Sequence, residues 1–185
     1  FGTKIDDTRD YVLEKYELGH KLIDGEPTKE LVDGQDPDKL FVERDILYLK
    51  DATDSEEGGR MVIVLPKQNL SGAQEESVEF RKWLLKKVQI TAIVDLPREA
   101  FQPHTGTKTS LVFLKKVKNI PEDYPIFMAV SEAVGHDRRG NPLYKKDASG
   151  MNLLGDDGKE VIWNDLPEIY AQWNSAAAPR DRRRE

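Results

Sequence analysis

Three short apolar runs constrain the fold of this chain more than any other feature of its sequence. They cover residues 61–65, 90–96 and 111–114, and Pro66 and Pro97 stop the first two. Runs of this length without alternating polar residues are typical of strands that are buried on both faces, as in open α/β sheets. The sequence therefore predicts an α/β domain built around a central sheet.

A helix is predicted between the first two strands, over residues 75–87, because apolar residues recur there at helical spacing. A strand, a helix and a second strand in this order form a parallel crossover, which is right-handed in nearly all proteins. Residues 111–114 follow with no room for another helix, so this strand is predicted to be antiparallel or to be a late insertion into the sheet. A further helix is predicted to begin at Asp36-Pro37, because aspartate caps helices and proline suits the first turn.

The other segments are predicted to be less regular. Residues 1–35 are expected to be irregular apart from one short helix, and residues 68–74 are expected to form a loop. Residues 126–130 are predicted to form an edge strand or an extended crossing segment because prolines precede them. Closely spaced glycines after it predict a small β appendage, and Asn164 or Asp165 is expected to cap a C-terminal helix.

These elements divide the chain into three parts. Residues 1–118 are predicted to form a partial α/β core, residues 119–175 an appended β segment and helix on the same domain, and residues 176–185 a disordered tail. No apolar run is long enough to cross a bilayer. The chain lacks cysteine, and its three histidines are far apart, so no metal site is predicted.

The charge balance limits how the chain can bind nucleic acid. Its formal net charge is -6, with 34% of its residues charged. Affinity for duplex DNA comes largely from cations that neutralise phosphates, so an acidic chain is not expected to grip DNA by itself. It can still belong to an assembly in which another domain or subunit holds the DNA.

Four sequence blocks, in this order, carry a resemblance to a known family. They are Leu96-Pro97 with Phe101 and Thr105-Gly106-Thr107-Lys108-Thr109, then Phe127-Met128-Ala129, then Gly135 to Gly140, then Asn164 to Ile169. Their order and wording resemble the adenine-N6 DNA methyltransferases, and specifically the modification subunit of type I restriction–modification systems. The resemblance implies the C-terminal half of a Rossmann-like class I methyltransferase sheet, with parallel strands and an antiparallel strand.

The resemblance also implies a catalytic role for the first residue. The family motif reads Asn-Pro-Pro-Phe followed by Gly, and this sequence begins with Phe1-Gly2. The Asn side chain and a Pro carbonyl accept the hydrogens of the adenine amino group, and the aromatic ring stacks on the base once it is flipped out. Phe1 is therefore interpreted as the remnant that supplies the stacking ring. The isolated chain is expected to be inactive.

The methyl donor of the family is S-adenosylmethionine, which binds at a glycine-rich turn after the first strand. No such turn is recognised in this sequence. Gly58-Gly59 precedes a predicted strand, so it is interpreted as a helix stop and tight turn. The chain itself is expected to contribute no cofactor-binding residues.

Three residues are candidates for contact with DNA. Phe101 is predicted either to pack against an extruded base or to anchor its loop in the domain. Lys108, beside Thr107, is interpreted either as a phosphate contact or as a solvated loop lysine. The tryptophans at 83, 163 and 173 are all predicted to be core residues.

The leading hypothesis is a part of a site-specific adenine-N6 DNA methyltransferase from a prokaryotic cytoplasm. The partners implied by the resemblance are DNA and the specificity and restriction subunits. One alternative is a non-catalytic methyltransferase-fold module that holds partner subunits. Another is a Rossmann-type oxidoreductase, although no phosphate-binding glycine turn supports it. Uncovered sheet surfaces are expected to make the isolated chain self-associate.

Overall fold

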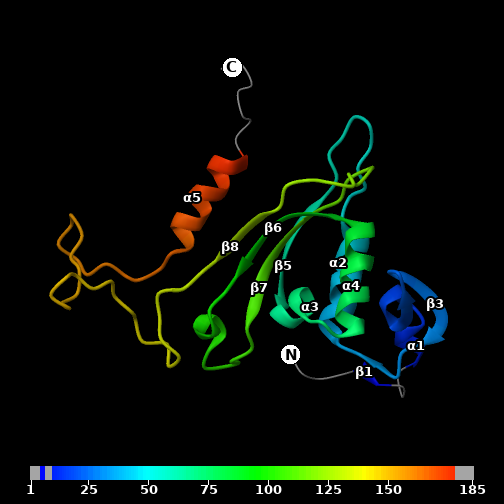
Figure 1. Cartoon of the computed structure of the whole chain (residues 1–185), viewed down its shortest axis with the longest axis horizontal. Coiled ribbons are helices and arrows are strands. Elements are labelled where there is room, and N and C mark those ends of the chain that lie inside the picture. Colours follow the sequence, from blue (N-terminus) through cyan, green and yellow to red (C-terminus); the bar gives the residue numbers. More distant parts are fainter. Residues whose placement is uncertain (1–4, 7–9, 178–185) are drawn as a thin grey trace. The chain divides into compact units, whose positions relative to one another are not determined.

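The computed structural model describes residues 5–6 and 10–177. The chain forms two compact units (Figure 1). Unit 1 comprises Phe1–Ile93 and Thr109–Ile126, and unit 2 comprises Val94–Lys108 and Phe127–Glu185. The domain boundary after residue 118 that the sequence suggested stays a prediction.

A four-stranded sheet is the centre of the fold, with the strand order β5-β7-β6-β8. Its strands are β5 (Arg60–Pro66), β6 (Gln89–Asp95), β7 (Thr109–Lys115) and β8 (Phe127–Val130). β7 pairs antiparallel with β5 along its whole length, which confirms the predicted orientation of this strand. β7 lies between β5 and β6, so the two strands of the predicted crossover are not neighbours.

Two helices of unit 1 cover one face of the sheet. They are α2 (Pro37–Tyr48) and α4 (Glu75–Lys87), and Figure 1 shows both on the same side of the strands. The predicted bounds of α4, residues 75–87, are confirmed. Side chains from both helices and from β5, β6 and β7 belong to one buried cluster, and its large members include Trp83, Phe80, Leu65, Leu84 and Leu114.

The prediction of a loop at residues 68–74 is wrong, because a short helix, α3 (Lys67–Ser71), follows β5 directly. The Ser71 hydroxyl donates to the Lys67 carbonyl at 3.1 Å, and the Gly72 amide donates to the Gln68 carbonyl at 2.7 Å. These local bonds close a single helical turn, which is too short to produce a recognisable apolar period.

The prediction of irregular structure before residue 36 is also wrong in part. A hairpin of β2 (His20–Ile23) and β3 (Glu26–Leu31) follows α1 (Asp10–Leu13) and the 3-10 turn η2 (Glu17–Gly19). The turn of the hairpin is fixed from outside, because the Gly25 amide donates to the Glu79 carboxylate of α4 at 2.7 Å. Two short strands complete this region, β1 (Ile5–Asp6) and its antiparallel partner β4 (Gly34–Gln35).

Unit 2 contains the 3-10 turn η3 (Arg98–Phe101), the β appendage and α5 (Leu166–Ala177). The appendage is built from isolated antiparallel bridges between residues 134 and 164. α5 begins as expected, since the Leu166 amide donates to the Asn164 side chain at 3.0 Å. The Asp165 carboxylate instead accepts from the Ser131 hydroxyl and the Glu132 amide, both at 2.6 Å. Of the predicted tail, residues 178–185 lie outside the described residues.

Candidate functional site

The predicted DNA-contact residues lie together in the segment of residues 96–108, which follows β6 in unit 2. Phe101 ends η3 and is 37% exposed. Thr107 and Lys108 close the same segment just before β7. Phe1, the remaining sequence-predicted site residue, lies outside the described residues.

This segment is folded by its own hydrogen bonds. The Thr105 amide donates to the Phe101 carbonyl at 3.0 Å, and the Thr107 amide donates to the Thr105 hydroxyl at 3.2 Å. The Thr105 hydroxyl in turn donates to the Thr107 hydroxyl at 3.0 Å. Arg98 adds a longer contact, 3.4 Å from Nη1 to the Gly106 carbonyl. Thr107 therefore helps to shape the loop, and Phe101 is presented beside it with a third of its surface open.

Lys108 differs from most lysines of unit 1. Lys82, Lys86, Lys87 and Lys116, for example, each lie within 2.8 Å of a carboxylate oxygen. Within the described residues, Lys108 is exposed and has no hydrogen bond or ion pair. Its ammonium group is therefore free to meet an anion that the chain does not supply.

The same segment forms one wall of a pocket of about 430 Å3 in unit 2. The opposite wall comes from the appendage. Residues that line the pocket include Pro97 and Glu99 from the segment, and His136, Arg138, Leu143 and Trp163 from the appendage. Sequence reasoning did not predict this site. The charged block between Gly135 and Gly140 belonged to the predicted β appendage, and nothing in the sequence indicated that it would line a pocket.

Trp163 corrects an expectation from the sequence. It was predicted to be a core residue like Trp83, which is 1% exposed, but 42% of Trp163 is exposed. Its neighbour Ile162 is 51% exposed, so the apolar run at residues 161–163 does not enter a core. The misreading has a simple cause: the run resembles a buried strand in sequence, but the appendage is too thin to cover both of its faces.

The tip of the appendage beside this pocket contains one carboxylate, Asp137, followed by two arginines, Arg138 and Arg139. The Asp137 carboxylate accepts from the Asn141 side chain at 3.0 Å and from the Asn141 and Arg139 amides at 2.9 and 2.7 Å. These hydrogen bonds hold the pKa of Asp137 below its usual value, and the bond from the Asn141 side chain contributes most. Arg138 and Arg139 are exposed, and neither has an ion pair among the described residues.

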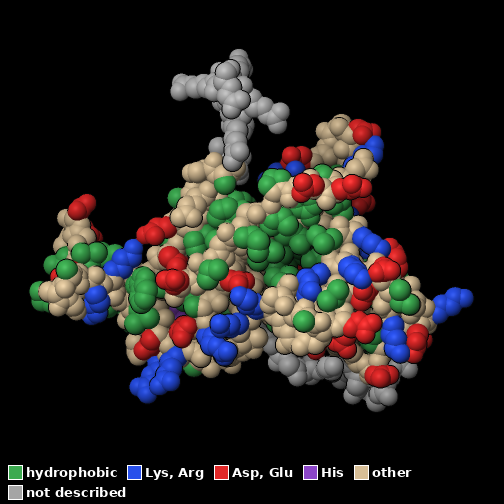
Figure 2. Space-filling model, viewed as in Figure 1, with side chains coloured by type: hydrophobic (Ala, Val, Ile, Leu, Met, Phe, Trp, Pro, Cys, Tyr) green, Lys and Arg blue, Asp and Glu red, His purple; other side chains and the backbone are tan. Residues whose placement is uncertain are grey.

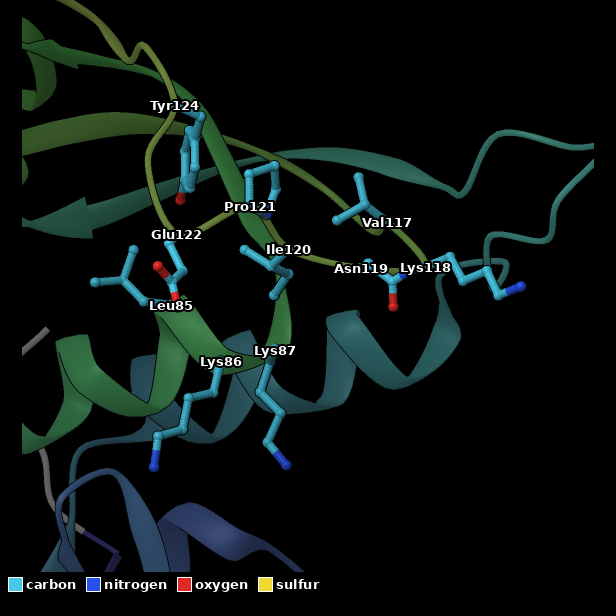
Figure 3. A pocket seen from close by; sticks show the side chains of 10 residues that line it. All are labelled: Leu85, Lys86, Lys87, Val117, Lys118, Asn119, Ile120, Pro121, Glu122 and Tyr124. Atoms are coloured by element: carbon cyan, nitrogen blue, oxygen red, sulfur yellow. The ribbon is translucent and has the colours of Figure 1, made fainter.

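A larger pocket of about 590 Å3 lies in unit 1, between the end of α4 and residues 117–124 (Figure 3). Its three lysines are already neutralised, Lys86 by Glu26, Lys87 by Glu17 and Lys118 by Asp54. Figure 3 shows the Lys86 and Lys87 side chains pointing away from the segment of residues 117–124. This pocket contains none of the predicted site residues and offers no free cation.

The glycines of unit 1 show whether a methyl-donor turn of the expected kind is formed. β5 passes directly into α3 without a glycine-rich turn, and Gly58-Gly59 precedes β5. A Cβ on Gly58 would lie 2.1 Å from the Lys116 carbonyl oxygen, so this glycine permits two backbones to approach closely. In the described part of the chain, the residues therefore do not fit the glycine-rich turn that holds S-adenosylmethionine. The location of the donor pocket stays a prediction.

Among the described residues, no group of three or more His, Asp or Glu side chains is placed to hold a metal ion. None of the helices described is both long and apolar enough to span a membrane.

Three solved structures show a partial similarity to this chain. One is a candidate class I S-adenosylmethionine-dependent methyltransferase from Listeria monocytogenes, with 17% identity, a TM-score of 0.48, and coverage of 69% of this chain and 33% of that chain. Another is the modification subunit of a candidate type I restriction enzyme from Vibrio vulnificus YJ016, with 19% identity, a TM-score of 0.41, and coverage of 75% and 32%.

A third similar structure belongs to a type I restriction–modification system, with 20% identity, a TM-score of 0.43, and coverage of 63% of this chain and 22% of that chain. The chain thus spans a third or less of the length of these three proteins. No curated protein matches it at a significant level.

The sequence model of one family matches the chain directly. The family is described as N-6 DNA Methylase, and the match covers residues 35–154. The matched region runs from β4 through the sheet and the segment of residues 96–108 into the appendage. Since this region is well over half of the sequence, the chain belongs to the N-6 DNA methylase family.

Proposed function

We propose that this chain is part of the catalytic domain of a site-specific adenine-N6 DNA methyltransferase, the modification subunit of a type I restriction–modification system. The observation that carries the proposal is the family match over residues 35–154, which includes both the sheet and the segment with Phe101 and Lys108. The complete protein transfers a methyl group to adenine in DNA and works in the cytoplasm of a prokaryote with specificity and restriction subunits. S-adenosylmethionine supplies the methyl group when it is bound.

The residues of this chain have positioning roles in that reaction. Phe101, one-third exposed on a self-folded loop, packs against the extruded base or its neighbour. Lys108, which has no partner among the described residues, neutralises a DNA phosphate near the target base. Thr107 keeps the loop in shape through its hydroxyl contact to Thr105. Phe1 matches the aromatic position of the family motif and would supply the stacking ring.

The groups that activate the amino nitrogen precede Phe1 in the family motif. Because the lone pair of that nitrogen is delocalised into the adenine ring, two carbonyl acceptors are needed to localise and aim it. We infer that the isolated chain is catalytically silent, because the family motif places these acceptors before Phe1 and the described residues do not form a glycine-rich donor turn after β5. Its acidic net charge of -6 is consistent with a part that relies on other subunits to hold duplex DNA.

Two measurements test the proposal. The whole reading frame, expressed with its neighbouring subunit genes, should transfer tritium-labelled methyl groups from S-adenosylmethionine to DNA, and digestion should release N6-methyladenine. The isolated chain should give no heat when it is titrated with S-adenosylmethionine in a calorimeter. Label found only on cytosine, or a stoichiometric heat from the isolated chain, would contradict the proposal.

A non-catalytic assembly module that holds partner subunits is the second candidate function, favoured because β5 passes into α3 without a glycine-rich donor turn among the described residues. The reading frame upstream of Phe1 separates the two. Codons for Asn-Pro-Pro immediately before Phe1 support the methyltransferase, whereas a start codon at that position supports the module.

A further inference from the structure

The appendage pocket of unit 2 presents a tryptophan that is both rigid and exposed. The Trp163 amide donates to the Leu143 carbonyl at 2.7 Å, and the Trp163 carbonyl accepts from the Gly135 amide at 2.9 Å. Both hydrogen-bonding groups of its backbone are therefore fixed, while 42% of the residue stays exposed. A large ring held in this way on the wall of a pocket is typical of a stacking platform.

Polar groups of three kinds surround the ring. Arg138 lines the pocket and has no ion pair among the described residues. Glu99 and Glu132 also line it, and they too have no ion pair within the described part of the chain. His136 Nδ1 lies 2.9 Å from the Asp137 carbonyl oxygen, which leaves Nε2 as the other ring nitrogen available to a ligand.

These groups select among ligand classes. A purely apolar ligand would bury the Arg138 guanidinium and two carboxylates without partners, which is costly. A simple anion would meet Glu99 and Glu132 and would leave the Trp163 ring unused. A nucleotide matches the indole ring, the carboxylates and the guanidinium. Its base stacks on an indole, its amino groups donate to carboxylates, and its phosphate pairs with a guanidinium.

We propose that the appendage pocket binds one nucleotide of a single DNA strand, with the base stacked on Trp163 and a phosphate paired with Arg138. The proposal rests on the proposed function, which supplies DNA as the polymer. It adds a second contact to that function, because the pocket residues differ from Phe101, Thr107 and Lys108. A volume of about 430 Å3 accommodates a base with its sugar.

The first test measures the stacking contact. The fluorescence anisotropy of a labelled 12-nucleotide single-stranded DNA would be measured at low salt as the 185-residue chain is added. Trp163→Ala should weaken binding by about 5- to 150-fold, the range for one stacked base. Trp163→Phe keeps an aromatic ring and is a conservative change for folding. This variant should retain most of the affinity. Trp173→Ala on α5, outside this pocket, is the matched control and should bind like the parent chain.

The second test separates a local phosphate contact from general charge attraction. Arg138 and Arg139 are adjacent, exposed and equally charged, but only Arg138 lines the pocket. Arg138→Gln should lower the affinity several-fold and reduce the dependence of log K on log salt concentration by about 0.7, the value for one phosphate of a single strand. Arg139→Gln should leave both nearly unchanged.

Several results would overturn the inference. These are equal losses from the two arginine variants, no effect of Trp163→Ala, tighter binding of duplex than of single-stranded DNA, or no binding by the parent chain at low salt. Methyl transfer to adenine by the whole reading frame is measured separately. If that activity is found while the pocket variants bind normally, the inference fails and the proposed function stands.

Discussion

At the scale of the residue, a buried carboxylate fixes the N-terminal segment of unit 1. Glu43 of α2 is 6% exposed, and it accepts hydrogen bonds from the Glu17 and Leu18 amides, both at 2.8 Å. The Leu18 carbonyl accepts from the Gln35 side chain at 2.5 Å. Gln35 belongs to β4, which pairs with β1, so one carboxylate also supports this two-stranded sheet.

Glu43→Ala should lower the free energy of unfolding by about 3 kcal/mol, because it leaves two amides without acceptors, one of them buried. Burial raises the pKa of Glu43, and the folded state therefore binds the proton more tightly than the unfolded state. Between the unfolded and folded pKa values, stability contributed by this group must fall as pH rises. Urea unfolding of the parent chain and the variant at several pH values above 4.5 measures both effects.

Asp45→Ala is the control, since it removes the same charge from an exposed position on the same helix. It should change stability by less than about 0.5 kcal/mol and should leave this pH dependence in place. A loss at Asp45 as large as that at Glu43 would show that the charge of α2, rather than the two amide contacts, sets its stability.

At the scale of the element, the sequence predicted what local periodicity determines. The α4 helix and strands β5, β6 and β7 were found because their apolar residues repeat at helical spacing or in unbroken runs. The β2–β3 hairpin was missed because it is ordered from outside its own sequence. Lys82 of α4 pairs with Asp24 at 2.8 Å and Glu79 at 2.6 Å, and Glu79 accepts from Gly25.

The two parts of the candidate site also differ in how far the sequence indicated them. The segment of residues 96–108 was predicted because its motif is continuous in sequence. The appendage pocket was missed because its lining residues come from turns far apart in the chain, with Glu99 and Trp163 more than sixty positions from each other. An aromatic residue in an apolar run carries no local sign that it will be exposed, so only the fold revealed Trp163.

Gly25 is the position where the hairpin meets α4 most closely. Its φ is +73°, and a Cβ there would lie 2.7 Å from the Lys82 carbonyl carbon and the Trp83 nitrogen. Gly25→Ala should therefore carry two penalties: about 1–2 kcal/mol for the left-handed backbone, and a further loss from the collision with helix backbone that cannot yield. Hydrogen exchange of the amides in β2 and β3 should become faster as the hairpin detaches.

Gly150→Ala is the control for Gly25→Ala, because it carries the backbone penalty without the collision. Gly150 has a φ of +86°, but a Cβ there would meet nothing within 4 Å. This variant should lose only the backbone penalty, seen as a smaller shift of the denaturation midpoint. If the two alanine variants are equally stable, the hairpin does not depend on its contact with α4.

At the scale of the whole molecule, α2 and α4 cover one face of the sheet in unit 1, and side chains of its other face are exposed. Leu65, Val112 and Leu114 point into the helical core and are buried. In the antiparallel register, Val62 pairs with Phe113 and Val64 pairs with Leu111, so these four side chains share the opposite face. Val62 is 54% exposed. Figure 2 shows hydrophobic side chains gathered at the centre of this view, over the strands of the sheet.

α/β sheets normally have both faces covered, and a contiguous apolar surface of this kind favours association. The isolated chain should therefore self-associate, and its weight-average mass in sedimentation equilibrium should rise with concentration. Val62→Lys places a charge in the middle of the strand face and should shift the equilibrium toward monomer by at least tenfold, since burying an unpaired ammonium costs more than 1.4 kcal/mol.

Leu47→Lys is the control, because Leu47 is 67% exposed on α2, away from this face. A parent chain that stays monomeric at high concentration, or an equal effect of the two lysines, would show that the strand face is not what associates.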